Sequence, residues 1–248
     1  GMDAVVNLVG ILHQSRRESF EKVHAQLPAR LARACRAAGV LRLVHVSALH
    51  ADPGGPSEYL RSRGRGEAAL RSEGEGLAVT ILKPSVIFGR DDSFLNLFAG
   101  LVRPLPLVPL AGAGVRFQPV WVEDVAGAVA ACLVDSRTAG KAYDLCGPRA
   151  YTLAEIVRFV ARLQGLERAI VPLPGWAAYA QALVLERLPG PVMTRDNLAS
   201  MKVDSVCACP FPEVLGFEPS AMEDIVPEYM AAAGLRGRYA QYRRRTGR

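Results

Sequence analysis

Short apolar runs alternate with longer amphipathic stretches along the first two thirds of the chain. Three of the runs, at 4–9, 43–46 and 79–82, are rich in valine and leucine and lack a clean alternation with polar residues. Runs of this kind are typical of parallel strands that are buried on both faces. We therefore predict three buried strands here, and a fourth at 142–145.

Helical periodicity fills the intervals between these runs. Apolar residues recur every three or four positions over 20–38, which predicts one face of a helix that Gly39 stops. Pro28 lies inside that pattern, so the helix is kinked there or begins near it. Further helices are expected over 57–72, where Ser57 can cap the helix, and over 124–134. This alternation predicts a doubly wound α/β sheet.

The pattern changes after residue 148. Two capping boxes, Thr152-Leu-Ala-Glu155 and Ser220-Ala-Met-Glu223, predict helix starts. Between them, 172–212 contains six prolines and no further strand-and-helix unit. We therefore predict a small, mostly helical lobe over 149–235.

Positive charge is concentrated at the end of the chain. The formal net charge is +6, and six of the 30 basic residues lie in 236–248, which leaves 24 basic against 24 acidic residues elsewhere. A nucleic-acid-binding domain carries its basic residues on a folded face, so we expect no nucleic-acid partner. The tail is interpreted as a solvated end. The alternative is a weak contact with an anionic membrane.

The five cysteines are scattered and odd in number, and we interpret them as reduced thiols in a cytoplasmic protein. Cys207 and Cys209 lack a second pair of ligands at metal-binding spacing, so no metal site is expected. No basic leader precedes the first apolar run, which predicts no signal peptide. Three prolines interrupt 94–115, the most apolar long stretch, so no membrane span is expected.

Candidate chemistry begins with Tyr59 and Arg63, which stand four residues apart in a predicted helix. That spacing puts a phenol and a guanidinium on one helix face. A nearby cation favours the ionised phenol, which suits a tyrosine to acid–base work. Ser47 ends the preceding strand, where α/β sheets place ligand-contacting residues. Taken alone, this spacing is more often found on a solvated helix face.

Six segments in order resemble the extended and atypical branches of the short-chain dehydrogenase/reductase superfamily, the NAD-dependent epimerases and dehydratases. Tyr59 and Arg63 match the family's Tyr-x-x-x-Lys, with arginine in place of lysine. The other five segments are 3–10 beside the cofactor, 44–47, the proline-centred 83–90 beside the nicotinamide, 118–125, and 143–148 followed by Tyr151-Thr-Leu. The chain is most similar to relatives of the Rossmann-type accessory subunit of respiratory complex I, through Asn7, Gly10, His24, Asp196 and Asn197.

This resemblance implies a nucleotide-binding Rossmann-type domain over 1–148, with 90–115 contributing to the substrate lobe, then the lobe over 149–235 and the basic tail. It implies Tyr59 as general acid/base, Arg63 as its electrostatic helper and Ser47 as a hydroxyl partner for a small-molecule substrate. NAD or NADP would be contacted by Asn7, Gly10, Ser47, Tyr59, Arg63, Pro84 and Val86.

The alternative function is a non-catalytic structural or assembly protein resembling the complex I subunit. Arg63 in place of lysine favours this alternative, as does Ala48, which can occupy the place of the family's catalytic hydroxyl. The intact Tyr59 favours an enzyme.

The family's glycine loop, Gly-x-x-Gly-x-x-Gly, is absent from the sequence. Gly64-Arg-Gly66 lies inside a predicted helix and Gly112-Ala-Gly114 follows no predicted strand, so neither replaces a loop that cradles phosphate. In the family this loop precedes the strand that begins the chain. The resemblance therefore implies that the first βα units, roughly 60–75 residues, are missing, which puts dinucleotide binding in doubt.

The expected fold is thus an N-terminally truncated, doubly wound parallel Rossmann-type sheet with a small C-terminal, mostly helical lobe. A gene start placed too far downstream is the favoured explanation, because the later motifs are all present. A deliberately shortened fragment and a naturally short protein remain alternatives. The uncovered sheet edge and face predict a homodimer or a swapped arrangement that buries them.

Overall fold

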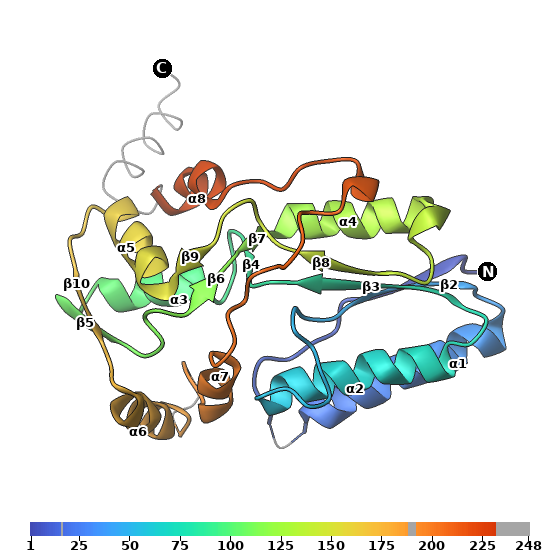
Figure 1. Cartoon of the computed structure of the whole chain (residues 1–248), viewed down its shortest axis with the longest axis horizontal. Coiled ribbons are helices and arrows are strands. Elements are labelled where there is room, and N and C mark those ends of the chain that lie inside the picture. Colours follow the sequence, from blue (N-terminus) through green and yellow to red (C-terminus); the bar gives the residue numbers. More distant parts are fainter. Residues whose placement is uncertain (16, 188–191, 232–248) are drawn as a thin grey trace, which may run out of the picture.

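The computed structural model describes residues 1–15, 17–187 and 192–231, and its centre is a parallel four-stranded sheet (Figure 1). The strand order is β1-β2-β3-β8. The bounds are β1 Ala4–Asn7, β2 Arg42–Val46, β3 Ala78–Pro84 and β8 Ala142–Leu145. Each predicted strand is present within two residues of its expected bounds. The predicted fold class, a parallel α/β sheet of the Rossmann type, is confirmed.

Helices cover both faces of this sheet. In Figure 1, α1 (Leu27–Ala38) and α2 (Glu58–Glu73) lie on one face and α4 (Val122–Val134) on the other. Neighbouring residues of β2 show why its run is continuously apolar. Leu43 belongs to the core under α1 and α2, whereas Val44 belongs to the core under α4. Successive side chains of a strand point to opposite faces, so both must be apolar.

The first helix begins with an unusual turn. A π-helical segment, η1 (Glu21–Gln26), leads into α1, and Pro28 is at the second position of α1. Pro28 has no N–H to donate, and the helical run from Glu21 to Ala38 continues through it from the π-helical turn. The helix ends at Gly39, whose φ of 70° is left-handed. The predicted cap of α2 is confirmed, since Ser57 Oγ accepts the N–H of Leu60 at 3.1 Å.

One of the two predicted capping boxes is present. Thr152 and Glu155 cap each other at the start of α5 (Leu153–Leu163). The box predicted at Ser220 is wrong, because α8 (Met222–Met230) begins after Ala221 without a side-chain cap. Ser220 instead donates its N–H and its hydroxyl to the Asp124 carboxylate. The Asp124 carboxylate on α4 therefore accepts from Ser220, and the predicted pairing of Ser220 with Glu223 does not form.

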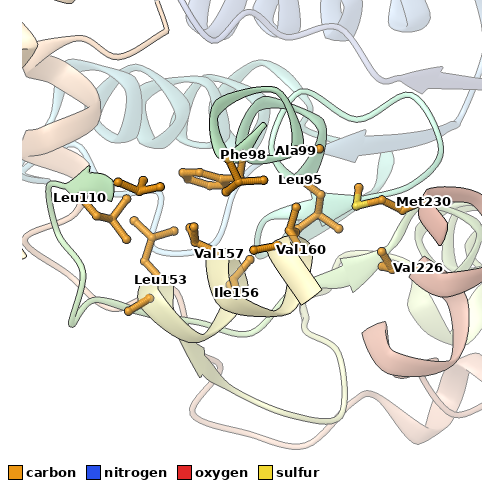
Figure 2. Packing of buried hydrophobic residues seen from close by; sticks show 14 of the residues in the cluster. Leu95, Phe98, Ala99, Leu110, Leu153, Ile156, Val157, Val160, Val226 and Met230 are labelled. Carbon is orange, nitrogen blue, oxygen red and sulfur yellow. The ribbon is translucent and has the colours of Figure 1, made fainter. Parts of the chain in front are cut away.

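The lobe is built from two separate parts of the chain. Between β3 and β8 lie α3 (Leu95–Val102) and β5 (Leu107–Leu110), and their apolar residues pack against α5 and α8 (Figure 2). β5 pairs in parallel with β10 (Ala169–Pro172). The remaining elements are β4 (Ile87–Phe88), β6 (Arg116–Phe117), β7 (Val120–Trp121), η2 (Ser136–Thr138), β9 (Tyr151–Thr152), α6 (Gly175–Leu185), α7 (Arg195–Ser200) and η3 (Glu213–Leu215).

The glycine pair at 112–114 does follow a strand, β5, contrary to the prediction. The chain then enters β6 rather than a helix, so the segment still lacks the strand–glycine–helix order of a phosphate loop. In the part of the chain described, no helix is long and apolar enough to cross a bilayer.

Two of the five cysteines form a disulfide. Cys146, directly after β8, is bonded to Cys207, with Cα atoms 6.1 Å apart. The interpretation of five reduced thiols is therefore wrong for this pair, and Cys207 is not free to bind metal. The segment before Cys207 runs beside Gln118, whose side chain accepts the Cys207 N–H and donates to the Gly147 carbonyl. The two cysteines are 61 positions apart, so no local sequence pattern indicates that they pair.

β1 is an edge strand among the described residues. Apolar side chains at and just beyond its end are exposed: Val6 by 36%, Leu8 by 65% and Val9 by 50%. Val5, by contrast, packs against the core under α1 and α2. One face of β1 is therefore covered and the other is open. The basic tail, 236–248, lies outside the described residues.

Candidate functional site

The predicted site residues gather at the carboxyl ends of three neighbouring strands. Asn7 ends β1, Ser47 follows β2 and Pro84 ends β3. Because β1, β2 and β3 are parallel and adjacent, these ends lie along one edge of the sheet. Ligands of open α/β sheets bind at this edge. Tyr59 and Arg63 reach it from α2.

Tyr59 and Arg63 lie together, with the guanidinium carbon 5.5 Å from the centroid of the phenol ring. Tyr59 is the second residue of α2 and is half-buried. Its ring meets Phe20 and His24 edge-on, with centroids 5.9 and 5.4 Å away. The aromatic contacts fix the ring, and the guanidinium contributes a cation–π interaction.

Arg63 is only 7% exposed, and its guanidinium lies at the carboxyl ends of β1 and β2. Its Nη1 donates to the Val46 carbonyl at 3.2 Å. Its Nη2 lies so close to Gly10 that a Cβ at that position would collide with it. Its Nε has no hydrogen-bond partner among the described residues. A side chain at position 10 would therefore have to displace the guanidinium, and the Nε–H of Arg63 is left for another acceptor.

His24 packs against the Tyr59 ring and is linked to the Tyr59 carbonyl through Ser62. It lies in η1 and is 1% exposed. Its Nε2 accepts the N–H of Ile11 at 3.1 Å, so its proton is on Nδ1, which donates to Ser62 Oγ at 2.9 Å. Ser62 Oγ in turn donates to the Tyr59 carbonyl at 2.8 Å. This chain of hydrogen bonds uses the neutral imidazole.

A second buried histidine, His45, lies on β2. Asn7 Nδ2 donates to its Nδ1 at 2.9 Å, which ties the ends of β1 and β2 together. Burial, reinforced by the Arg63 cation, lowers the pKa of His45 to about 3, and the same two causes lower the pKa of His24 to about 3. Both imidazoles are neutral near pH 7, so Arg63 supplies the positive charge next to Tyr59.

Ser47 is buried and its hydroxyl already has a partner. It is 3% exposed, and its hydroxyl donates to Glu67 Oε1 at 2.6 Å. Glu67, which is 2% exposed, also pairs with Lys83 Nζ and Arg71 Nη2, each at 3.1 Å. Ser47 therefore completes the surroundings of a buried carboxylate. Sequence reasoning missed Glu67, although it stands one helical turn beyond Arg63.

Pro84 and Val86 lie at the end of β3, two strands from Asn7. The Pro84 carbonyl accepts the N–H of Leu49 at 2.9 Å, and the Val86 carbonyl accepts that of Val120 at 3.0 Å. Both residues therefore hold neighbouring loops at the sheet edge. Their position brings them to the same edge as Asn7, but the Tyr59–Arg63 pair stands over β1 and β2.

The lobe reaches the site through Asp196 of α7. The Asp196 carboxylate accepts the N–H groups of Glu58 at 2.7 Å and Tyr59 at 3.0 Å. Together with the Ser57 cap, it satisfies the first three N–H groups of α2. Ser200 strengthens the contact by donating to Ser57 Oγ at 2.8 Å. The helix that carries Tyr59 is thus capped by a residue 137 positions away.

Comparison with known proteins shows which proteins the chain is similar to. No protein-family model matches the chain. The chain is 33% identical over 226 residues to the NADH dehydrogenase (ubiquinone) 1 alpha subcomplex subunit 9 of Mus musculus, and 32% identical over 232 residues to the 40 kDa NADH-ubiquinone oxidoreductase subunit of Neurospora crassa. These alignments cover 89% and 92% of this chain but 59% and 60% of the relatives. The ceramide reductase of Caulobacter vibrioides is 30% identical over 185 residues, which are 70% of this chain and 54% of that protein.

Solved structures share the fold at low sequence identity. The NADPH complex of the Escherichia coli quinone oxidoreductase has a TM-score of 0.73 at 18% identity, over 93% of this chain and 77% of the other. A dTDP-glucose 4,6-dehydratase of Streptomyces venezuelae with bound NAD has a TM-score of 0.71 at 19% identity, over 96% and 75%. The chain therefore has the short-chain dehydrogenase/reductase fold of these structures, and its sequence is similar to that of the curated relatives, of whose lengths it spans 54–60%.

Proposed function

We propose that this chain forms the nicotinamide and substrate side of an NAD(P)-dependent epimerase, dehydratase or reductase site. The observation that carries the proposal is the Tyr59–Arg63 pair, which stands over the carboxyl ends of β1 and β2. Proteins with the same fold have been solved with NAD or NADPH bound. The orphaned Nε of Arg63 also supports it, because a buried donor without an acceptor fits a ligand oxygen.

In this proposal, NAD(P) supplies hydride transfer and the protein supplies proton transfer and orientation. Tyr59 gives or takes the proton at a substrate hydroxyl or carbonyl oxygen. Arg63 places a positive charge beside the phenol. Asn7 and Gly10 shape the edge along which the ribose would lie, with Pro84 and Val86 at the end of β3.

The residues fit the ribose side better than the phosphate side. Gly64 and Gly66 are packing residues, since a Cβ on Gly64 would collide with the backbone at Asp52 and one on Gly66 with the carbonyl of His24. Both lie inside α2, so their N–H groups are in the helix and not in a phosphate loop. The groups that favour a dinucleotide are those around Tyr59, and the proposal is limited to them.

A second candidate function is a non-catalytic structural or assembly role. The hydroxyl of Ser47 is bonded to Glu67, and the next residue is Ala48, so no hydroxyl donor from this strand end stands beside Tyr59. The relatives of Mus musculus and Neurospora crassa are named as subunits of a larger assembly. In this role the same edge would bind a dinucleotide without turnover.

Titration with NADH and NADPH, followed by nicotinamide fluorescence, tests the proposal. We expect saturable binding by the chain and by Arg63→Lys, and binding about tenfold weaker or more for Arg63→Ala. Arg61→Ala is the matched control, because Arg61 lies on the same helix but pairs with Glu58 at the surface.

Turnover is then measured with a quinone and with dTDP-glucose as probes. Turnover that Tyr59→Phe abolishes supports the enzyme. Tight binding without turnover of either probe favours the structural role. A chain that shows no saturable binding overturns the assignment of a dinucleotide site.

A further inference from the structure

Helix α6 is almost entirely apolar and exposes several of its large side chains. The residues it buries are two alanines, Ala178 and Ala182. Trp176 is 78% exposed, Tyr179 50% and Val184 62%. The exposed three recur at helical spacing and so share one face, and Gly175–Leu185 contains no charged residue. A helix that turned its large apolar face inward would show the reverse pattern.

The neighbouring pair of strands extends this face. In β5 and β10, Leu107 is paired with Ala169 and Pro109 with Val171, and all four are exposed. The side chain of Gln181 donates to the Pro109 carbonyl at 3.4 Å, which ties α6 to β5. Figure 1 shows β5, β10 and α6 along the same side of the lobe.

We name this set the α6 surface, and it consists of Leu107, Pro109, Ala169, Val171, Trp176, Tyr179 and Val184. Exposed apolar side chains gathered on neighbouring elements mark a site of interaction with a protein or a membrane. The choice between the two depends on the chemistry of its rim.

Guanidinium groups flank the α6 surface at both ends. Arg187 follows α6 and donates to the Leu183 carbonyl. Arg103 and Arg168 lie just before β5 and β10 and donate to the side chain of Gln164 and to backbone carbonyls. In the ranges that the structure describes, no carboxylate forms an ion pair with these three arginines. Glu186, the acid closest to α6 in sequence, is paired with Arg195 at 2.8 Å.

We propose that the α6 surface docks on an anionic lipid bilayer. An uncharged helix with tryptophan and tyrosine on its outer face suits the boundary between headgroups and acyl chains, because both rings have an apolar body and a polar tip. Arginines with free N–H groups at the rim match the phosphates of anionic lipids. Exposed apolar side chains beside arginines that are unpaired among the described residues suit contact with the surface of an anionic membrane.

Flotation with vesicles tests this inference on the whole chain. The vesicles are phosphatidylcholine with or without phosphatidylglycerol, at low and high salt. We expect the chain to float with the anionic vesicles, and binding to fall by about tenfold or more in the triple variant Trp176→Ser, Tyr179→Ser, Val184→Ser. The control variant is Leu41→Ser, Val134→Ser, which removes residues 65% and 89% exposed on the sheet domain. Its binding should be unchanged.

Two further measurements separate the alternatives. The chain has two tryptophans, so Trp121→Phe leaves Trp176 as the reporter, and its emission should shift to the blue on anionic vesicles. Deletion of 236–248 should leave most of the apolar, salt-resistant binding in place. An unbound chain, or a triple variant that floats like the original, would overturn the inference. A triple variant that instead abolishes a lipid-free dimer would assign the α6 surface to contact between copies.

Discussion

Replacing Asp196 by alanine should loosen the helix that carries Tyr59. The carboxylate accepts two backbone N–H groups at 2.7 and 3.0 Å at the positive end of α2. Losing a helix cap costs about 1 kcal/mol, within a range of 0.5–2, and hydrogen bonds to charged groups lie at the upper end of their range. Because Asp196 is half-buried and water partly replaces it, we expect a loss of about 2 kcal/mol.

This loss can be measured in two ways. Urea unfolding at pH 7, followed by circular dichroism, should show a lower midpoint with an unchanged slope if the contact contributes to global stability. Native-state hydrogen exchange should show faster exchange at the amides of residues 58 and 59 by about 30-fold, which corresponds to about 2 kcal/mol. Asp196→Asn keeps one acceptor and should lose about half as much free energy.

Glu218→Ala is the matched control, since it removes an exposed carboxylate from the same part of the chain. Its unfolding midpoint and its exchange at residues 58 and 59 should equal those of the unaltered chain. If Asp196→Ala behaves like this control in both measurements, the carboxylate does not hold α2, and the argument that α7 positions the Tyr59 helix fails.

Four other outcomes are expected. Glu67→Ala should destabilise the chain by about 3 kcal/mol in urea unfolding, because it leaves buried donors without their acceptor; a change below about 1 kcal/mol would contradict the buried network. Gly66→Ala should destabilise by about 2 kcal/mol, since the added methyl meets a backbone carbonyl, whereas a gain in stability would show that the helices can separate there. The pKa of His24 and of His45 is about 3 in the folded chain and 6.5 in the unfolded chain, so the unfolded state binds more protons between these values. The free energy of unfolding should therefore fall as the pH drops from 6.5 toward 3, by about 1 kcal/mol per imidazole between pH 6.5 and 5.5. A free energy of unfolding that does not change over this range would refute the burial of neutral imidazoles. The open edge of β1 should make the chain a dimer in light scattering after gel filtration, and a monomer at high concentration would count against it.

The sheet was predictable because its strands are runs of apolar residues. Val44 and Leu43 face opposite sides of β2 and are both fully buried, so a run without polar residues has one good solution. Local rules also found the Ser57 cap and the Thr152 box. They failed at Ser220, where the Asp124 carboxylate competes for the same donors. A local sequence pattern can identify a helix end whose N–H groups need acceptors, but it does not identify an acceptor that is distant in the sequence.

The candidate site divides in the same way. Tyr59 and Arg63 were predictable, since their spacing places them on one face of α2. The roles of Asp196, Glu67 and His45 depend on contacts between segments far apart in sequence, and no spacing encodes them. The disulfide of Cys146 was missed for this reason. Ser47 shows the converse case, because its place at a strand end was correct while its hydroxyl turned to a carboxylate that the pattern did not reveal.

The two-part construction of the lobe has a consequence during synthesis. The apolar face of α3 is complete at residue 102, but its partners α5 and α8 begin at 153 and 222. At about 5–20 residues per second, the ribosome needs about 3–10 s to add the first partner and about 6–24 s to add the second. During that interval Leu95, Phe98 and Val102 have no lobe core to enter. The nascent chain is therefore most open to chaperones, and to misassembly, after α3 and before α8.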